Sequence, residues 1–264
     1  MCGRLNQFAK LPALSLAGRA LRVERRKDSG KEDVRSQAPS IHNLCPTDYA
    51  DVLTMEESEL VATRMRFGLI PSWAKGGKAE VNKKFRLTFN ARSETIFELA
   101  SYRQAVMQRR CLVPVTGWHE WPDRGTPYFI HNADGSPLLL AAIWDVWQSP
   151  LAEDQASGPM HTSMSVVTTP PGRYMAKFHD RSPLVLDGER ALAWLSPGQA
   201  KEELQSFFQP YESELLEAYR VSNAALLPQN KSAESLVPIS SPVPQMDDVS
   251  VADENETPEL GLEL

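Results

Sequence analysis

The second residue of the chain carries its most distinctive chemistry. Met1 precedes Cys2, and an initiator methionine is normally removed when the next residue is small. Removal leaves a free α-amine and a thiol on adjacent carbons. Because such an amine has a pKa of about 7.7–8.0, an appreciable fraction is neutral near pH 7 and can attack an aldehyde. The thiol can then close on the imine carbon as a thiazolidine, so Cys2 is a candidate aldehyde trap.

Three polar motifs further along the chain add to this hypothesis, since cysteine after a start codon is weak evidence by itself. They are NARSET at 90–95, GWHEW at 117–121 and HDRSP at 179–183. We expect all three at strand ends or in loops, where functional residues tend to lie. Their carboxyl and imidazole groups are suited to acid–base work, and the asparagine can bind without carrying charge.

Short strands and separate helices must position these motifs. Apolar alternation and turn residues predict strands at 49–55, 59–67, 111–115, 128–132, 138–147, 164–169 and 184–186. Apolar spacing predicts helices at 11–26, 93–108, 189–195 and 200–208, and a basic loop at 76–84. Strands and helices in this arrangement are typical of an α+β fold.

Composition narrows the class of protein. The 264 residues contain three cysteines in scattered positions, which disfavours a disulfide framework or a cysteine-based zinc site. We therefore expect no metal or other cofactor. We find no signal pattern and no apolar run long enough to cross a membrane. The sequence thus predicts a soluble cytoplasmic protein.

Charge is distributed unevenly over the chain. Residues 1–110 hold 20 Lys and Arg against 12 Asp and Glu, whereas residues 231–264 hold one Lys and eight acidic residues. A basic half suits a polyanionic partner. The acidic, Pro- and Ser-rich end predicts a folded domain over 1–228 and a disordered tail over 229–264.

Five motifs in order resemble one known family. MCGR at the start, FGLIPSW at 67–73 and the three polar motifs are similar to those of the SRAP family, the SOS-response-associated peptidases or abasic-site-processing proteins. The resemblance spans roughly residues 2–227. It implies one α+β domain of curved, barrel-like antiparallel sheets with flanking helices, and a monomer that needs no cofactor.

The resemblance also implies an activity in the DNA damage response. Its substrate is single-stranded DNA containing an abasic site, to which Cys2 forms a covalent thiazolidine crosslink that shields the lesion. The protein itself is expected to remove Met1 as an autopeptidase, and lyase-type chemistry at the sugar is implied as well. We expect it in the cytoplasm, associated with the nucleoid on damaged DNA.

Carried over by position, four residues form the catalytic set. Cys2 is the nucleophile through its amine and sulfur, and Asn90 orients the terminal residue or the opened sugar. Glu120 transfers protons, helped by a pKa that Trp118 and Trp121 would raise, and His179 is a second acid or base.

The same resemblance suggests how the strand is held. Arginines beside the motifs can grip phosphates, tryptophans can stack on bases, and a proline can wedge at the strand gap. The predicted DNA-binding residues are Arg4, Pro71, Trp73, Arg92, Trp121 and Arg181. Trp118 is expected in the core instead.

The family pattern is not matched at Phe67, His119 and Ser182, and its C-terminal VN signature is blurred over Val221–Leu227. None of these departures removes a proposed catalytic group. Two other functions stay open. A non-catalytic module for single-stranded DNA would bind intact and abasic strands equally. An N-terminal-nucleophile amidohydrolase would release ammonia from glutamine, but we find no convincing downstream motif for its oxyanion donors.

Overall fold

The structure is a computed structural model. It describes residues 3–8, 15–16, 19–20, 23–25, 42–57, 59–122, 125–150 and 160–245. The predicted nucleophile Cys2 therefore lies outside the described residues.

Strands dominate the described chain. They are β1 (Leu5–Asn6), β2 (Ser15–Leu16), β3 (Arg19–Ala20), β4 (Val23–Arg25), β5 (Tyr49–Glu56), β6 (Glu59–Phe67), β7 (Asn90–Arg92), β8 (Arg110–Val115), β9 (Gly117–Glu120), β10 (Tyr128–Asn132), β11 (Leu138–Gln148), β12 (Met160–Thr169), β13 (Ser182–Pro183), β14 (Val185–Leu186) and β15 (Leu216–Arg220). The α-helices are α1 (Lys78–Lys84), α2 (Arg103–Gln108), α3 (Gly188–Leu195) and α4 (Lys201–Ser206), and short 3-10 helices are η1 (Met175–Lys177), η2 (Asn223–Leu226) and η3 (Ala233–Leu236).

Five of these strands close into a barrel. Their order is β12, β11, β8, β5 and β6, and β6 pairs again with β12. Closure leaves these strands without open edges. Between described strands, the pairings of β12 with β6, β12 with β7 and β4 with β6 are parallel. The predicted α+β class with barrel-like sheets is confirmed, although the sheets are mixed and not purely antiparallel.

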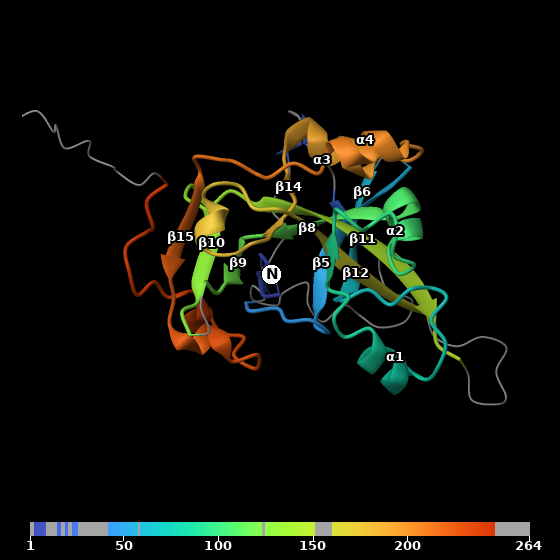
Figure 1. Cartoon of the computed structure of the whole chain (residues 1–264), viewed down its shortest axis with the longest axis horizontal. Coiled ribbons are helices and arrows are strands. Elements are labelled where there is room, and N and C mark those ends of the chain that lie inside the picture. The colour runs from blue at the N-terminus through green and yellow to red at the C-terminus, as the bar shows by residue number, and fades with distance from the viewer. Residues whose placement is uncertain are drawn as a thin grey trace, which may run out of the picture.

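A second sheet of four strands lies beside the barrel. Its order is β1, β9, β10 and β15, and it occupies the left side of Figure 1, with α3 and α4 at the top of the view and α1 at the bottom. Gly117 begins β9 where a Cβ would lie 2.2 Å from the backbone oxygen of Ile130. Only glycine therefore allows β9 to lie this close to β10.

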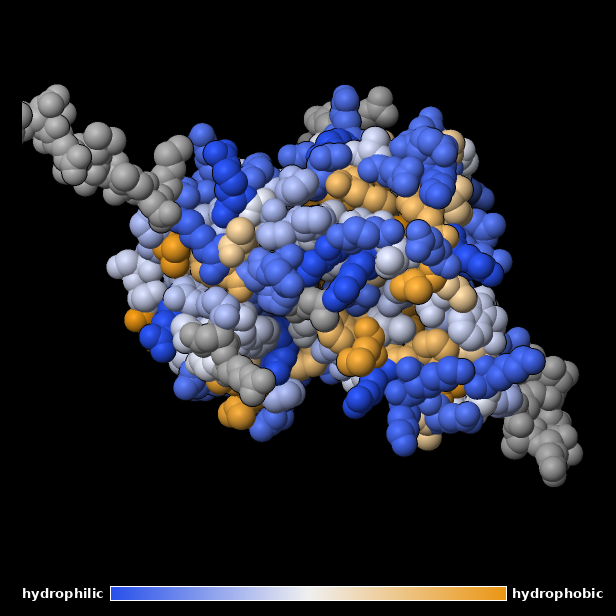
Figure 2. All heavy atoms as spheres, viewed as in Figure 1, coloured by the Kyte–Doolittle hydropathy of each residue, from blue (hydrophilic) through white to orange (hydrophobic). Residues whose placement is uncertain are grey.

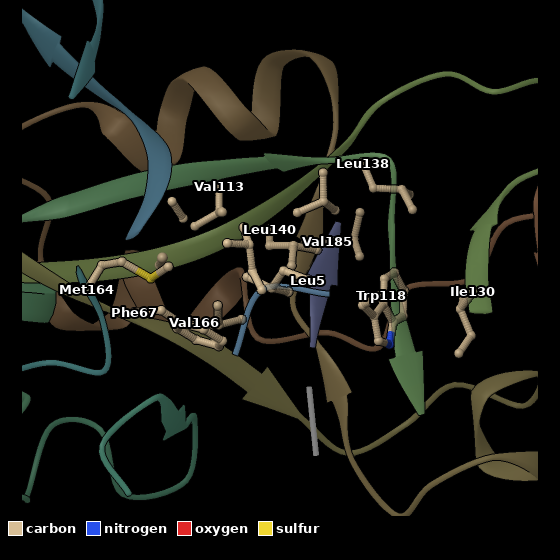
Figure 3. Packing of buried hydrophobic residues seen from close by; sticks show 14 of the residues in the cluster. Leu5, Phe67, Val113, Trp118, Ile130, Leu138, Leu140, Met164, Val166 and Val185 are labelled. Carbon is tan, nitrogen blue, oxygen red and sulfur yellow. The ribbon is translucent and has the colours of Figure 1, made fainter. Parts of the chain in front are cut away.

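Barrel side chains alternate between two apolar clusters, as the two-residue period of a strand requires. Leu140 belongs to the sheet cluster, which also contains Leu5, Trp118 and Ile130 from the second sheet (Figure 3). Its neighbour Leu139 belongs to the helix cluster, in which α2, α3 and α4 cover the strands. The barrel strands, which position the motifs, are thus packed on both faces by apolar side chains.

Several local predictions need correction. The described parts of 11–26 are short strands, not a helix, because spacings such as Leu14–Leu16 and Leu21–Val23 fit a strand period as well. Only Arg103–Gln108 of the helix predicted over 93–108 is helical, and the loop predicted over 76–84 contains α1. No helix among the described residues is long and apolar enough to cross a membrane.

The C-terminal region also differs from expectation. Although disorder is predicted for 229–264, the described residues up to Gln245 pack on the domain, and those from Pro238 on run beside β15. The backbone N–H of Ile239 donates to Arg220, and that of Val243 donates to Ala218, each at 2.8 Å. Ser235 is completely buried. The open edge of β15 supplies partners that composition cannot reveal. Residues 246–264 lie outside the described residues, so their disorder stays a prediction.

Removing this segment should weaken the whole domain. A chain that ends at Leu227 loses the edge pairing and the buried contacts of Ser235, so we expect its free energy of unfolding to fall by at least about 2 kcal/mol. Urea denaturation measures this change. A chain that ends at Gln245 is the control and should match the full protein. Equal stability of the two truncated chains would contradict the packing described here.

Candidate active site

The first described residues are held beside the end of β9. Leu5 of β1 pairs with Trp118 of β9 in an antiparallel register. Continuing that register sets Gly3 opposite Glu120. The chain segment that carries MCGR and the segment that carries GWHEW are thus neighbouring strands of one sheet.

Glu120 is a completely buried carboxyl. Tyr128 stands directly across from it on β10, and the Tyr128 ring lies 5.2 Å from that of Phe178. Burial raises the pKa of Glu120 to about 7. The charge and hydrogen bond of the amino terminus oppose this shift, whereas the charge of Asp180 adds to it. At neutral pH the carboxyl can therefore both donate and accept a proton.

A buried histidine supports β9 from its other side. His119 Nδ1 lies 3.2 Å from the Asn6 amide nitrogen, and its Nε2 lies 3.0 Å from the backbone oxygen of Ser235. Burial lowers the pKa of His119 to about 4. The ring is neutral at pH 7, so Nδ1 accepts from Asn6 and Nε2 donates to Ser235. The sequence did not predict that His119 connects β9 to Asn6 and Ser235. A histidine within an otherwise buried strand was the signal for this role.

His179 lies in a loop whose backbone is folded against its ring. Its Nδ1 lies 3.0 Å from the Arg181 backbone nitrogen and 2.6 Å from Asp180 Oδ1. The unprotonated nitrogen can accept from Arg181, and the protonated nitrogen can donate to Asp180. Burial, and next the charge of the amino terminus, lower the pKa of His179. The ring therefore has a local partner in both protonation states.

Arg181 joins two of the predicted motifs. Its guanidinium makes a two-pronged ion pair with Glu94, with a Nη2–Oε2 distance of 2.9 Å, and Nη2 also donates to the Thr168 backbone oxygen at 2.6 Å. Only 9% of Arg181 is exposed. The geometry thus fits a group that fixes the His179 loop to the NARSET segment. A direct phosphate contact, the role expected from the sequence, stays a prediction.

Asn90 presents an unused amide in the same region. It begins β7 opposite Val166, a member of the sheet cluster, while the next residue, Ala91, belongs to the helix cluster. The Asn90 side chain therefore points toward the sheet cluster. Its Oδ1 and Nδ2 are buried and have no hydrogen-bond partner among the described residues. Such a group is unusual in a folded protein and favours a ligand-binding role.

The predicted DNA contacts fall into two groups. Arg4 and Trp121 are partly buried and contact each other, with the guanidinium 5.6 Å from the ring centre. Arg4 also donates to Asn43 Oδ1 at 2.7 Å and to the Ala225 backbone oxygen at 3.0 Å. The Arg4 guanidinium therefore already has partners within the protein, and it connects the start of the chain to η2.

The other group lies on or near the surface. Trp73 is 46% exposed, and its Nε1 donates to the Ala100 backbone oxygen at 3.1 Å, so the ring is both accessible and fixed. Arg92 is exposed at the end of β7, whereas Pro71 is buried. Trp73 and Arg92 are thus better placed than Pro71 to meet a strand from solvent.

The remaining cysteines have structural surroundings. Cys111 lies in the sheet cluster, where burial raises the pKa of its thiol well above the ordinary value. Cys45 donates to the Asn43 backbone oxygen at 3.3 Å. Within the described ranges, no group of three or more His, Cys, Asp and Glu side chains is placed to hold a metal ion.

Replacing Glu120 with glutamine should change how stability depends on pH. The native pKa of about 7 exceeds the ordinary 4.5, so the stability that the protonated carboxyl contributes is complete below pH 4.5 and is lost as the pH rises through 7. Relative to wild type, Glu120→Gln should therefore gain up to about 3 kcal/mol between pH 4 and pH 8. Urea unfolding across this range tests it. A constant difference between the two proteins would contradict a raised pKa.

This chain is similar to known proteins in sequence and, in one solved structure, in fold. The family model for the SOS response associated peptidases (SRAP) matches residues 1–226. Abasic site processing protein YoqW of Bacillus subtilis is 31% identical over 198 residues, which cover 73% of this chain and 84% of that protein. Abasic site processing protein HMCES of Gallus gallus is 30% identical over 214 residues, covering 72% of this chain and 61% of that protein. A crystal structure from Bacteroides thetaiotaomicron has a TM-score of 0.65 and 29% identity, over 76% of this chain and 88% of the other. This chain therefore belongs to the SRAP family.

Proposed function

We propose that the protein captures abasic sites in single-stranded DNA by forming a covalent thiazolidine through Cys2. One observation above all supports this. The pairing of β1 with β9 sets the start of the chain beside Glu120, a buried carboxyl with a pKa of about 7. The charge of the amino terminus also lowers the pKa of His179, which supports a site that combines the start of the chain with both groups. The names of the YoqW and HMCES relatives agree with this substrate.

The first step frees the nucleophile. Hydrolysis of the Met1–Cys2 peptide bond consumes one water and leaves the α-amine on Cys2. Glu120 is suited to activate that water as a base, because about half of its carboxyl groups are ionised near pH 7. This step is the autopeptidase activity that the resemblance implies.

Capture then needs two bonds and releases one water. The neutral amine adds to the aldehyde carbon of the opened sugar and gives a carbinolamine. Protonated Glu120 gives its proton to the hydroxyl group, which leaves as water, and the Glu120 carboxylate takes up the nitrogen's proton as the neutral imine forms. The Cys2 thiolate adds to the imine carbon, and the thiol proton ends on the ring nitrogen. No oxidant, reductant or metal is consumed.

The other predicted residues hold the opened sugar and its strand. The Asn90 amide, which has no hydrogen-bond partner within the described ranges, can bind a sugar hydroxyl, and His179 can exchange a proton with that hydroxyl. Trp73 offers an accessible face for a neighbouring base, and Arg92 offers a charge for a phosphate. The covalent product shields the lesion, while lyase-type cleavage would compete from the imine stage.

The test is a denaturing gel after mixing the protein with a single-stranded oligonucleotide that has one abasic site. We expect a heat-stable adduct with wild type and none with Cys2→Ala, because the ring requires sulfur. Cys2→Ala retains an amine, so borohydride should still trap its imine. A strand with a tetrahydrofuran in place of the abasic sugar is the control, since it has no aldehyde.

Two results would overturn the proposal. A heat-stable adduct of undiminished yield with Cys2→Ala would exclude the ring, and an adduct on the tetrahydrofuran strand would exclude the aldehyde. Equal, salt-sensitive binding of intact and abasic strands without any adduct would instead indicate a non-catalytic module. Ammonia release from glutamine would indicate an amidohydrolase.

A further inference from the structure

A cavity of about 220 Å³ lies on the barrel away from Glu120 and His179. Strand register builds its wall, since Tyr49 of β5 pairs with Arg66 of β6, Arg66 pairs with Ser163 of β12, and His161 of β12 pairs with Trp147 of β11. Because paired residues and those two apart share one face, these side chains converge from four barrel strands. Lys78 and Asn82 of α1 complete the lining.

Two buried side-chain nitrogens of this cavity have no hydrogen-bond partner in the described part of the chain. Arg66 is only 6% exposed, and its Nη2 has no hydrogen-bond partner among the described residues. The buried Nε2 of His161 likewise has none within the described part of the chain. An unused guanidinium nitrogen at such burial is costly unless something binds it.

The charged side chains that line the cavity are all positive. Arg66 and Lys78 are cationic, and no acidic side chain is among the described residues that line it. The surface over α1, at the lower right of Figure 2, is strongly hydrophilic. His161 stacks on Trp147 with ring centres 5.5 Å apart, which fixes the imidazole. An anion with several acceptor oxygens would satisfy these donors together.

A glycine makes room for the arginine. Gly68 has a φ of +108°, and a Cβ there would lie 2.9 Å from Arg66 Nη1. The first residue after the FGLIPSW phenylalanine thus both permits the turn and leaves the guanidinium its place.

The same loop connects this cavity to Trp73. Trp147 Nε1 donates to the Ala74 backbone oxygen at 2.8 Å, and Ile70 lines the cavity. On β12, His161 is five residues before Val166, the partner of Asn90, so the cavity and Asn90 lie on opposite faces of this strand, about 17 Å apart along it. Trp73 and the loop that carries it therefore provide the route by which a bound strand can reach the cavity within a few nucleotides.

We propose that this cavity binds a backbone phosphate of the captured single strand, with Arg66 and Lys78 supplying charge and His161 a hydrogen bond. This assignment rests on the proposed function for the identity of the ligand. It gives the protein a second anchor, separate from the reacting sugar, that sets which nucleotides beside the lesion are gripped.

The test scans an intact single strand, so that no covalent step contributes. One phosphate at a time is replaced by a neutral methylphosphonate, and affinity is measured by anisotropy. For wild type we expect one position at which neutralisation weakens binding about tenfold. Lys78→Ala and Arg66→Met should bind more weakly and lose the sensitivity at that position. Lys83→Ala removes an exposed charge from the same helix outside the lining, and should retain it.

Thermal melting checks that Arg66→Met is folded. If it is not, Lys78→Ala alone decides the test, because Lys78 is exposed and its replacement should not affect folding. Uniform sensitivity at every phosphate, while abasic capture proceeds, would overturn this inference and leave the proposed function intact. If abasic capture fails but neutralising one phosphate still weakens binding, the proposed function is overturned and the phosphate site is retained. Calorimetry with inorganic phosphate distinguishes a site for a DNA backbone phosphate from a site for free phosphate. Phosphate binding that Lys78→Ala abolishes but the intact strand does not displace would also overturn the assignment to DNA.

Discussion

The antiparallel pairing of β1 with β9 is the contact on which the active-site arrangement depends. It sets Gly3 opposite Glu120, and the packing of Leu5 and Trp118 into the sheet cluster keeps that register from slipping. A slip by one residue would turn Leu5 out of the core. Apolar packing therefore fixes where the start of the chain lies relative to the Glu120 carboxyl. The described chain thus begins beside Glu120, which is where the proposed function needs the terminal amine.

Burial gives the ordinary residues of this site their properties. Glu120 and His119 are both nearly inaccessible, yet desolvation favours a protonated carboxyl in one and an uncharged ring in the other. Arg181 and Arg4 bind carboxylate or carbonyl groups instead of solvent, and so join distant segments around the catalytic groups. Arg66 likewise donates from Nη1 to the Gly68 backbone oxygen, but its Nη2 has no partner among the described residues. That nitrogen is the one that the proposed phosphate would bind.

Sequence patterns predicted most barrel strands, because apolar alternation is a local signal. Motif order identified the candidate site residues, and their meeting at one site stays a prediction. Neither signal predicted that Arg181 is engaged by Glu94, since 87 residues separate the pair. The helix predicted from 93 begins only at Arg103, where tertiary contacts of the NARSET segment override apolar spacing. Packing of 229–245 was missed because it depends on the open edge of β15. The phosphate cavity likewise arises from register across four strands, which no linear pattern contains.

We propose that the amino terminus and Glu120 form one reaction centre. The most direct measurement is the pKa of the Glu120 carboxyl, followed by carbon NMR in protein with a free amino terminus and in protein acetylated there. The account predicts a pKa near 7 in the free protein and a higher value after acetylation, because the terminal charge lowers it. A pKa near the ordinary 4.5 that does not respond to acetylation would contradict the claim.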